Sequence, residues 1–315
     1  PPPAVMQKLR AVLARGGTSK ALLVRSQDLP PAGAARDKLL LAAMGSPDPT
    51  AMQLNGMGAG ISSTSKVAVL GPSTRPDCDI DYLFGQVSLT EPVIDWAGSC
   101  GNIASAVGVF AISEGYVSPG SAPVKTPVRI WQQNTGVRMV AHVPTSGGDL
   151  DYDESAGFVE LPGVPGLAPG ILVESESPMV GDKLFPTGKL RDTVTLPDGK
   201  QAEATVIAAG NHTIFVRATD IGLTGAELPS ELQYKGRMDL IIDSLRASAA
   251  SLMGMDQPHA GLRAAWIAEP SDFTSSSKEV IAAGSVDVLS RISTEGRIHH
   301  AHTGTGAIAL ACAAM

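Results

Sequence analysis

Two segments without a single charged residue constrain the fold of this chain more than any other feature. Residues 103–112 read IASAVGVFAI and residues 307–315 read AIALACAAM, so each is apolar around its whole circumference if helical. A helix with no polar face has to be buried on every side. We therefore expect two central helices, each enclosed by other elements. Strands following the second helix would be needed to cover it, which predicts that the sequence as given is incomplete at its C-terminus.

Both segments follow a turn of small residues, 99–102 and 303–306, and both turns share a Cys/Thr-Gly-x-x-Ala pattern. Short alternating segments typical of β-strands surround them. We predict strands at 11–13, 21–25, 66–70, 80–84, 128–131, 137–143, 202–208 and 213–217, and further helices at 35–44 and 232–253. The repetition predicts an α+β protein made of two similar domains, residues 1–182 and 183–315, each with β-strands wrapped around one buried helix.

Composition and charge exclude several classes of protein. With 43% hydrophobic and 17% charged residues and a net charge of −7, the chain is expected to be globular and not to bind nucleic acid. No stretch reaches the roughly 18 apolar residues of a membrane span, and the first residues lack signal-peptide features. We therefore expect a cytoplasmic protein with no membrane partner. The odd number of cysteines, Cys78, Cys100 and Cys312, predicts free thiols.

Cys100 lies at the predicted start of the first apolar helix. Unpaired backbone N–H groups and the positive end of the helix dipole lower the pKa of a thiol placed there from about 8.5. The N–H groups of Gly101 and Asn102 also form a site for a carboxylate or an enolate. The alternative is a small buried cysteine packed against a turn. Cys312 and Cys78 have no comparable setting.

Lys66 enters a hydrophobic predicted strand directly after a loop of hydroxyl-bearing residues, 62–65. Desolvation and nearby helix N-termini disfavour the charged form of a lysine, which lets it act as a base near neutral pH. If the loop is extended, Ser62 and Thr64 share a face with Lys66 and can bind a substrate carboxylate. The alternative is a solvent-exposed lysine on an edge strand.

Two other patterns suggest a cofactor or a metal, and neither is complete. Residues 56–60 read only GxGxG, without the strand-then-helix context of a nucleotide-binding loop. His299, His300 and His302 are not expected to converge as the three or four ligands that a metal needs. We therefore predict no cofactor and no metal, and expect one histidine, His299, to contact the substrate. Asn211, before a predicted strand, is either a turn residue or a carboxylate ligand.

The chain carries six short motifs in order, at residues 15–20 (RGGTSK), 60–66, 99–102, 184–188 (LFPTG), 210–211 and 303–307. With these motifs the sequence resembles the PrpF-like isomerases, which belong to the diaminopimelate epimerase-like superfamily. The resemblance implies two similar domains, each a β-structure around a central helix. It also implies an active site in a cleft toward which both helices point their N-termini.

The resemblance further implies roles for individual residues. In the epimerase branch a cysteine at each helix start works as acid and base on opposite faces of one carbon. Here Cys100 fills the first position but Thr303 fills the second, and a threonine hydroxyl is too weak an acid or base for that role. The PrpF-like branch instead places a lysine in the cleft, and Lys66 occupies that motif position.

These roles imply a cofactor-independent 1,3-allylic isomerase, or tautomerase. Lys66 would abstract a proton next to a double bond, and Cys100 would return one or merely hold the substrate. The remaining expected substrate contacts are small polar residues, helix-start amides and one histidine: Thr18, Ser19, Ser62, Thr64, Gly101, Asn102, Asn211, His299, Thr303, Gly304 and Thr305.

Similarity along the whole chain favours 4-oxalomesaconate, an intermediate of bacterial protocatechuate (lignin-fragment) degradation, as the substrate. 2-Methylaconitate and methylitaconate are the alternatives within the family. A racemase or epimerase and a non-catalytic accessory protein are the competing classes. The expected partner is a small polycarboxylate, and a homodimer is left open.

Overall fold

A computed structural model describes residues 8–154, 157–177, 179–232, 237–258, 261–294 and 297–315. Its described residues divide into two compact units, which we treat separately. Unit 1 comprises Pro1–Trp96, Ile103–Val159 and Ala168–Ser175, and unit 2 comprises Ala97–Asn102, Glu160–Leu167 and Glu176–Met315. The segment Ala97–Asn102, directly before the first apolar helix, therefore packs with the second half of the chain. The boundary at residue 182 stays a prediction.

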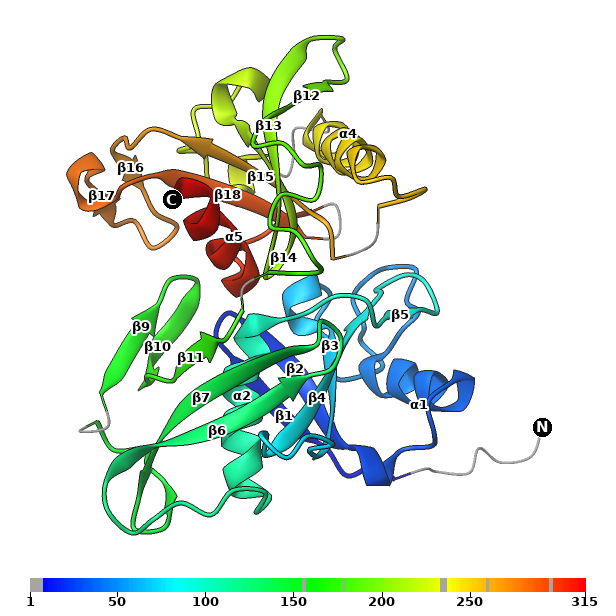
Figure 1. Ribbon diagram of the computed structural model, residues 1–315, viewed down its shortest axis with the longest axis vertical. Coiled ribbons are helices and arrows are strands. Elements are labelled where there is room, and N and C mark those ends of the chain that lie inside the picture. Colours follow the sequence, from blue (N-terminus) through cyan, green and yellow to red (C-terminus); the bar gives the residue numbers. More distant parts are fainter. Residues whose placement is uncertain (1–7, 155–156, 178, 233–236, 259–260, 295–296) are drawn as a thin grey trace. The chain divides into compact units, whose positions relative to one another are not determined.

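Unit 1 is built on a nine-stranded mixed sheet (Figure 1). The main path runs β1-β2-β3-β4-β6-β7-β11, with β5 paired to β4 and β8 paired to β7. The bounds are β1 (Val12–Gly16), β2 (Ser19–Arg25), β3 (Lys66–Pro72), β4 (Ile80–Val87), β5 (Ile94–Asp95), β6 (Val124–Gln132), β7 (Val137–Ser146), β8 (Asp149–Leu150) and β11 (Leu172–Ser175). A separate pair consists of β9 (Phe158–Leu161) and β10 (Val164–Pro169), most of whose residues are counted with unit 2.

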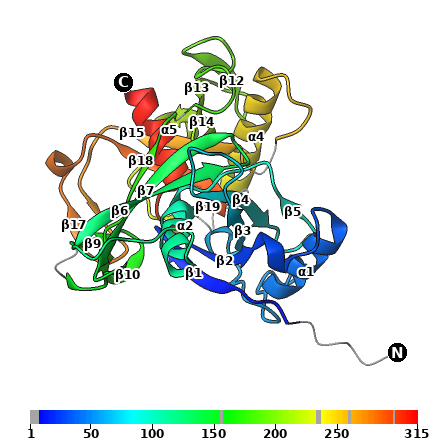
Figure 2. The same ribbon diagram turned by 60° about the horizontal axis from the view of Figure 1, so that its bottom comes forward.

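The two helices of unit 1, α1 (Ala34–Met44) and α2 (Gly101–Ser113), cover opposite faces of this sheet (Figures 1 and 2). α1 packs against Val67 and Val69 of β3. Because side chains alternate along a strand, Lys66 and Ala68 point to the other face. α2 lies on that face, where the absent side chain of Gly108 lets the helix approach Val143 of β7. β3 is therefore covered on both sides, which explains why its residues are buried from Lys66 to Gly71.

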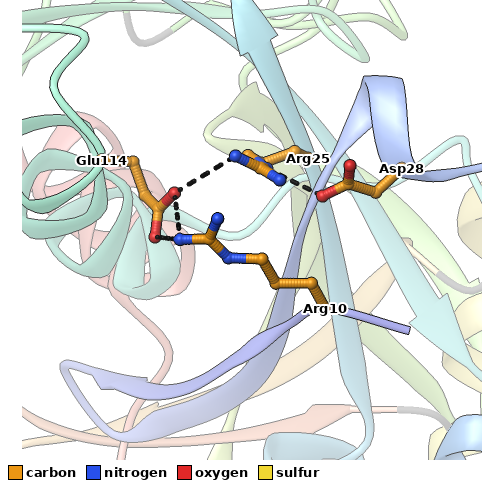
Figure 3. A network of polar contacts seen from close by, with 4 residues as sticks. All are labelled: Arg10, Arg25, Asp28 and Glu114. Carbon is orange, nitrogen blue, oxygen red and sulfur yellow. Dashed lines mark hydrogen bonds and ion pairs between the residues drawn. The ribbon is translucent and has the colours of Figure 1, made fainter. Parts of the chain in front are cut away.

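An ionic network fixes the carboxyl end of α2 (Figure 3). Glu114, the residue after α2, binds Arg10 at 3.1 Å and Arg25 at 3.7 Å. Arg25 also binds Asp28 at 2.7 Å, and this contact raises the pKa of the Arg25 guanidinium. Gly115 ends the helix in a left-handed conformation (φ 76°), which a glycine adopts without steric cost. The carboxyl end of α2 is therefore fixed, and this restricts the position of the whole helix, including its amino end.

Unit 2 contains a second mixed sheet, with the order β12-β13-β14-β15-β18-β19. Its strands are β12 (Asp192–Thr195), β13 (Gln201–Ala209), β14 (Asn211–Arg217), β15 (Arg263–Ala268), β18 (Leu289–Thr294) and β19 (Arg297–Ile298). β16 (Phe273–Thr274) pairs with β17 (Val280–Ile281) apart from it. The helices are α3 (Pro229–Leu232), α4 (Arg237–Leu252) and α5 (Gly304–Ala314).

As in unit 1, the helices α4 and α5 lie on opposite faces of the sheet (Figure 1). α4 packs against a core that includes Ile214 and Trp266. α5 packs against the alternate residues, among them Phe215 and Ala265.

The two units repeat the same succession of elements. An antiparallel pair (β1-β2 or β13-β14) leads through a 3-10 turn to a helix on the outer face (α1 or α4). A strand parallel to the second strand of that pair follows, then an antiparallel neighbour (β3-β4 or β15-β18). A short paired strand (β5 or β19) then precedes the apolar helix (α2 or α5). Internal duplication, predicted from the two helix-start turns, is thus visible in the topology.

The eight predicted strands are confirmed, with ends that differ by a few residues. The predicted helix at 35–44 corresponds to α1, and the helix at 232–253 corresponds to α4, although residues 233–236 lie outside the described residues. The expectation that an apolar helix is buried on every side holds for α2, and the expectation that strands following α5 cover it stays a prediction. Ala307 and Ala311 of α5 are exposed, because its sheet covers one face only. Among the described residues, no helix has the length and apolar character of a membrane span.

Candidate active site

Lys66 is buried at the first position of β3, with 6% of its surface exposed. Its Nζ donates a hydrogen bond to Oε1 of Gln86, the residue directly opposite on β4. The Gln86 amide in turn donates to the carbonyls of Ser62 (3.1 Å) and Ser65 (3.0 Å). The ring of Phe84 lies 5.4 Å from Nζ. The alternative of a solvent-exposed lysine is therefore wrong, and the amine has a fixed position in the α2-facing layer.

The glycine-rich loop before β3 is explained by packing. Gln53, which is 1% exposed, donates to Ser46 (2.8 Å) and accepts from the Ser65 hydroxyl (2.6 Å) and the Gly60 N–H (3.1 Å). A side chain at Gly58 would collide with the Gln53 amide. The GxGxG pattern therefore lets the loop close around a buried glutamine, which accounts for the glycines without a nucleotide.

The expected extended conformation of the serine-rich loop is not observed. Residues Ser62–Thr64 form a 3-10 turn, so Ser62 and Thr64 do not share a strand face with Lys66. The Thr64 hydroxyl donates back to the carbonyl of Ile61 (3.1 Å), a local bond that closes the turn. A substrate-binding role for Ser62 and Thr64 stays a prediction, without the strand geometry that suggested it.

Thr18 and Ser19 lie at the same end of the unit 1 sheet as Lys66. Gly17, at φ 51°, and Thr18 form the turn between β1 and β2, and the Arg15 guanidinium braces it by donating to the Gly17 carbonyl (2.8 Å). Ser19 is the first residue of β2 and is 4% exposed. Lys66 pairs with Ala21, two residues further along β2, so Ser19 and Lys66 face the same side of the sheet.

Asn211 joins the two small-residue turns within unit 2. Its side-chain N–H₂ donates to the carbonyl of Ser99 (3.3 Å) and to the hydroxyl of Thr305 (2.9 Å). The amide is 4% exposed and both of its protons are used. The structure therefore gives Asn211 a positioning role: it holds the segment before α2 against the first turn of α5.

The helix starts also touch each other directly. The position of a Cβ on Gly304 would be 2.9 Å from Oδ1 of Asn102, and that on Gly101 would be 3.7 Å from Cγ2 of Thr305. Larger residues at either glycine would push the turns apart. The predicted convergence of residues 99–102 with residues 303–306 is thus observed inside one compact unit.

The first turn of α5 has hydrogen-bond donors to spare. The Thr303 hydroxyl caps the helix by accepting from the Gly306 N–H (2.9 Å), and the Thr303 carbonyl accepts from the Ala307 N–H (2.9 Å). Among the described residues, the N–H groups of Gly304 and Thr305 have no partner. Two adjacent donors at the positive end of a helix dipole favour an anion.

His299 has a defined tautomer. Its Nδ1 accepts the Ala301 N–H at 3.1 Å, so the proton of the neutral ring is on Nε2. The ring is 5% exposed and stacks on His300 with centroids 4.5 Å apart. Burial lowers the pKa of His300, and burial is also the main cause of the lowered pKa of His302. Among the described residues, no group of His, Cys, Asp and Glu is arranged to hold a metal ion.

The three cysteines are free thiols, as predicted. Cys100 is 8% exposed and directly precedes α2. Cys78 lies in a different setting. Burial raises the pKa of its thiol, and the Asp77 carboxylate contributes further in the same direction. Cys312 packs beside the apolar core under α5.

Reasoning from the sequence missed Gln86, Arg263 and Thr213, three buried polar residues beside the predicted ones. Each lies in a strand or at a strand end among apolar neighbours. A polar residue inside an apolar strand was the available signal, but its partner is identified only by the register of the sheet.

Comparison with known proteins shows to which family the chain is similar. It matches the PrpF protein family over residues 6–315. It is 41% identical to the 2-methyl-aconitate isomerase of Shewanella oneidensis, over 98% of this chain and 81% of that protein. It is 39% identical to the 4-oxalomesaconate tautomerase of Pseudomonas putida, over 79% of this chain and 66% of that protein.

Solved structures agree with the family match. The crystal structure of a methylitaconate-delta-isomerase superimposes with a TM-score of 0.71 at 32% identity, covering 94% of this chain and 78% of that one. A probable proline racemase from Agrobacterium radiobacter shares the fold at a TM-score of 0.54 and 14% identity, over 94% of this chain and 74% of that one. The mixed helices and strands of both units fit the α+β architecture of this fold. The chain is an isomerase that belongs to the PrpF family.

Proposed function

We propose that this isomerase catalyses a cofactor-independent 1,3-allylic proton shift in an unsaturated tricarboxylate. The observation that carries the proposal is Lys66: a buried amine, held by a glutamine carbonyl and an aromatic ring, at the first position of a strand in the middle of a sheet. An amine held in this way has a fixed direction for proton transfer, as general base catalysis requires. Cys100 is the second candidate acid–base residue.

The proposed reaction needs no oxidant or reductant. Lys66 takes a proton from the carbon next to the double bond, and the electron pair of that C–H bond moves into the conjugated carboxylate. A proton then returns to the carbon at the far end of the allylic system, delivered by Lys66 or Cys100, and the double bond has moved by one position. The negative oxygen of the intermediate is stabilised by N–H groups such as those of Gly304 and Thr305.

Among substrates, 2-methylaconitate is the first candidate. The relatives that bear this name share more of their sequence with this chain, and over more of its length, than those named for 4-oxalomesaconate. The comparisons therefore favour the alternative over 4-oxalomesaconate, the substrate favoured from the sequence. A link to lignin-fragment degradation loses its support with that change.

Proton NMR in heavy water tests this proposal. Purified enzyme is incubated separately with 2-methylaconitate, methylitaconate and 4-oxalomesaconate, and the loss of each substrate and the exchange at each carbon are followed. We expect the largest kcat/KM for 2-methylaconitate, with solvent deuterium in the product. Faster turnover of 4-oxalomesaconate would overturn the substrate assignment, and no turnover of any of the three would overturn the proposed reaction.

A further inference from the structure

The side-chain amide of Gln86 fits its surroundings in one orientation. Its Nε2 donates to the carbonyls of Ser62 (3.1 Å) and Ser65 (3.0 Å), and a carbonyl only accepts hydrogen bonds. The oxygen of the amide, Oε1, therefore faces the Nζ of Lys66, from which it accepts. Gln86 is 5% exposed, and all of these partners lie in unit 1. The surrounding backbone thus fixes a hydrogen-bond acceptor beside the amine.

A second buried glutamine holds the loop that supplies these carbonyls. The Gln53 side chain accepts from the Ser65 hydroxyl (2.6 Å) and donates to Ser46 (2.8 Å). Among the described residues, no hydrogen bond joins Gln53 to Lys66. Gln53 therefore stabilises the loop, whereas Gln86 connects the loop to the amine.

Gln86 is an uncharged member of a row of polar residues across the sheet. Lys66, Gln86 and Asp95 lie directly opposite one another on β3, β4 and β5, so they share one face. α2, on that face, carries no ionisable side chain. On the same face of β2 to β5, the ionisable residues besides Lys66 and Asp95 are Tyr82 and Arg25, four residues further along their strands. The immediate partner of the amine on β4 is therefore a neutral amide, at a position where a glutamate of nearly the same size would fit.

We propose that Gln86 is a positioning residue for proton transfer: it fixes the direction of the Lys66 amine without placing a charge beside it. Because the Gln86 carbonyl only accepts, the amine turns one N–H bond toward it, and the lone pair that takes the proton points away from Gln86. A carboxylate would also accept this bond, but it would stabilise the ammonium form, which has no lone pair. This inference rests on the proposed function, since it assigns the partner of the same base.

The pH dependence of kcat with 2-methylaconitate tests the inference in two variants. Gln86→Glu keeps the acceptor and adds a negative charge, which raises the pKa of the neighbouring amine. Since the ammonium form then persists to higher pH, the acid limb of the kcat profile should move up by about one pH unit or more. Gln86→Met keeps the length of the side chain and removes its hydrogen bonds. It should lower kcat about 10- to 100-fold, with KM changed less than about threefold, because the base is present but no longer directed.

A titration of the Lys66 amine by NMR needs no substrate. In protein labelled with carbon-13 at the lysine Cε, the signal that is missing from Lys66→Met belongs to Lys66, and its chemical shift reports the protonation of the amine. The midpoint of this titration should be higher in Gln86→Glu than in wild type by about one pH unit or more.

Gln53→Met is the matched control, because it removes the other buried glutamine bound to this loop. It should lower the Tm, since Ser46 and Ser65 lose a buried partner. Both the Lys66 midpoint and the acid limb of kcat should stay at their wild-type positions.

An unmoved Lys66 midpoint in Gln86→Glu, or wild-type kcat in Gln86→Met, would overturn the inference. So would a shift of the midpoint in Gln53→Met as large as that in Gln86→Glu, because the loop as a whole would then set the amine. Failure of the proposed function gives a different result: the wild-type enzyme converts no unsaturated tricarboxylate, whereas the Lys66 midpoint still moves in Gln86→Glu.

Discussion

Asn211 offers the most direct test of how the two helix starts are held together, and the informative change is Asn211→Asp. The carboxyl group has nearly the same shape as the amide but has at most one proton to donate. The carboxyl can accept from the Thr305 hydroxyl, but it can donate to the Ser99 carbonyl only while it is protonated. When the carboxyl is ionised, the buried Ser99 carbonyl loses its donor, and keeping the carboxyl protonated at neutral pH itself costs stability.

The magnitude follows from the group left without a partner. A buried acceptor that loses its donor destabilises the protein by about 1–3 kcal/mol. For a unit of this size that corresponds to a Tm lower by about 3–9 °C. Because the segment before α2 is no longer fixed to α5, we also expect faster amide exchange in residues 97–102 and 303–307, and a lower kcat/KM.

Differential scanning calorimetry and hydrogen exchange followed by mass spectrometry measure these effects. Asn55→Asp is the matched control, since Asn55 is exposed and the substitution makes the same chemical change. If Asn211→Asp matched Asn55→Asp in Tm and in exchange at both turns, the positioning role of Asn211 would be refuted.

Three further predictions concern the elements around the site. Gly108→Val places a side chain where Val143 and Ala141 already lie within 3 Å of an added Cβ, so α2 is pushed from the sheet; we expect a loss of about 1–3 kcal/mol in the free energy of unfolding, measured in urea. Burial holds the pKa of His302 below its usual 6.5, so stability is present above that pH and is lost as the pH falls toward the lower folded-state value. His302→Gln should flatten the dependence of Tm on pH over that window, and an unchanged slope would contradict it. Glu114→Gln breaks the network with Arg10 and Arg25 and should lower the Tm slightly at low salt, with the difference vanishing at high salt.

Much of the fold was predictable because its signals are local. The absence of charge in residues 103–112 and 307–315 predicted two apolar helices, and the shared helix-start pattern predicted the duplication. Which side chains of α5 are exposed, Ala307 and Ala311 among them, was not predictable, since it depends on which elements cover the helix. A local sequence pattern does not show which distant strands cover a helix.

The candidate site was predictable in its residue types and less so in its contacts. The apolar strand after Lys66 predicted its burial, and the helix-start motifs predicted the nearness of Gly101 and Thr305. Gln86 and Arg263 were missed because their positions beside Lys66 and Thr213 come from strand pairing across 20 and 50 residues. That register is set by the packing of whole sheets, which no short window of sequence contains.

The central claim is that Lys66 is the base of an allylic proton shift, and deuterium exchange measures it most directly. Wild-type enzyme and Lys66→Met are incubated with 2-methylaconitate in heavy water, with Lys20→Met, a change of the same kind on β2, as the control. The account predicts deuterium at the allylic carbon with wild type and Lys20→Met, and none with Lys66→Met. Lys66→Met should still bind tricarballylate, a saturated tricarboxylate that cannot undergo the reaction. Wild-type rates of exchange in Lys66→Met would contradict the account.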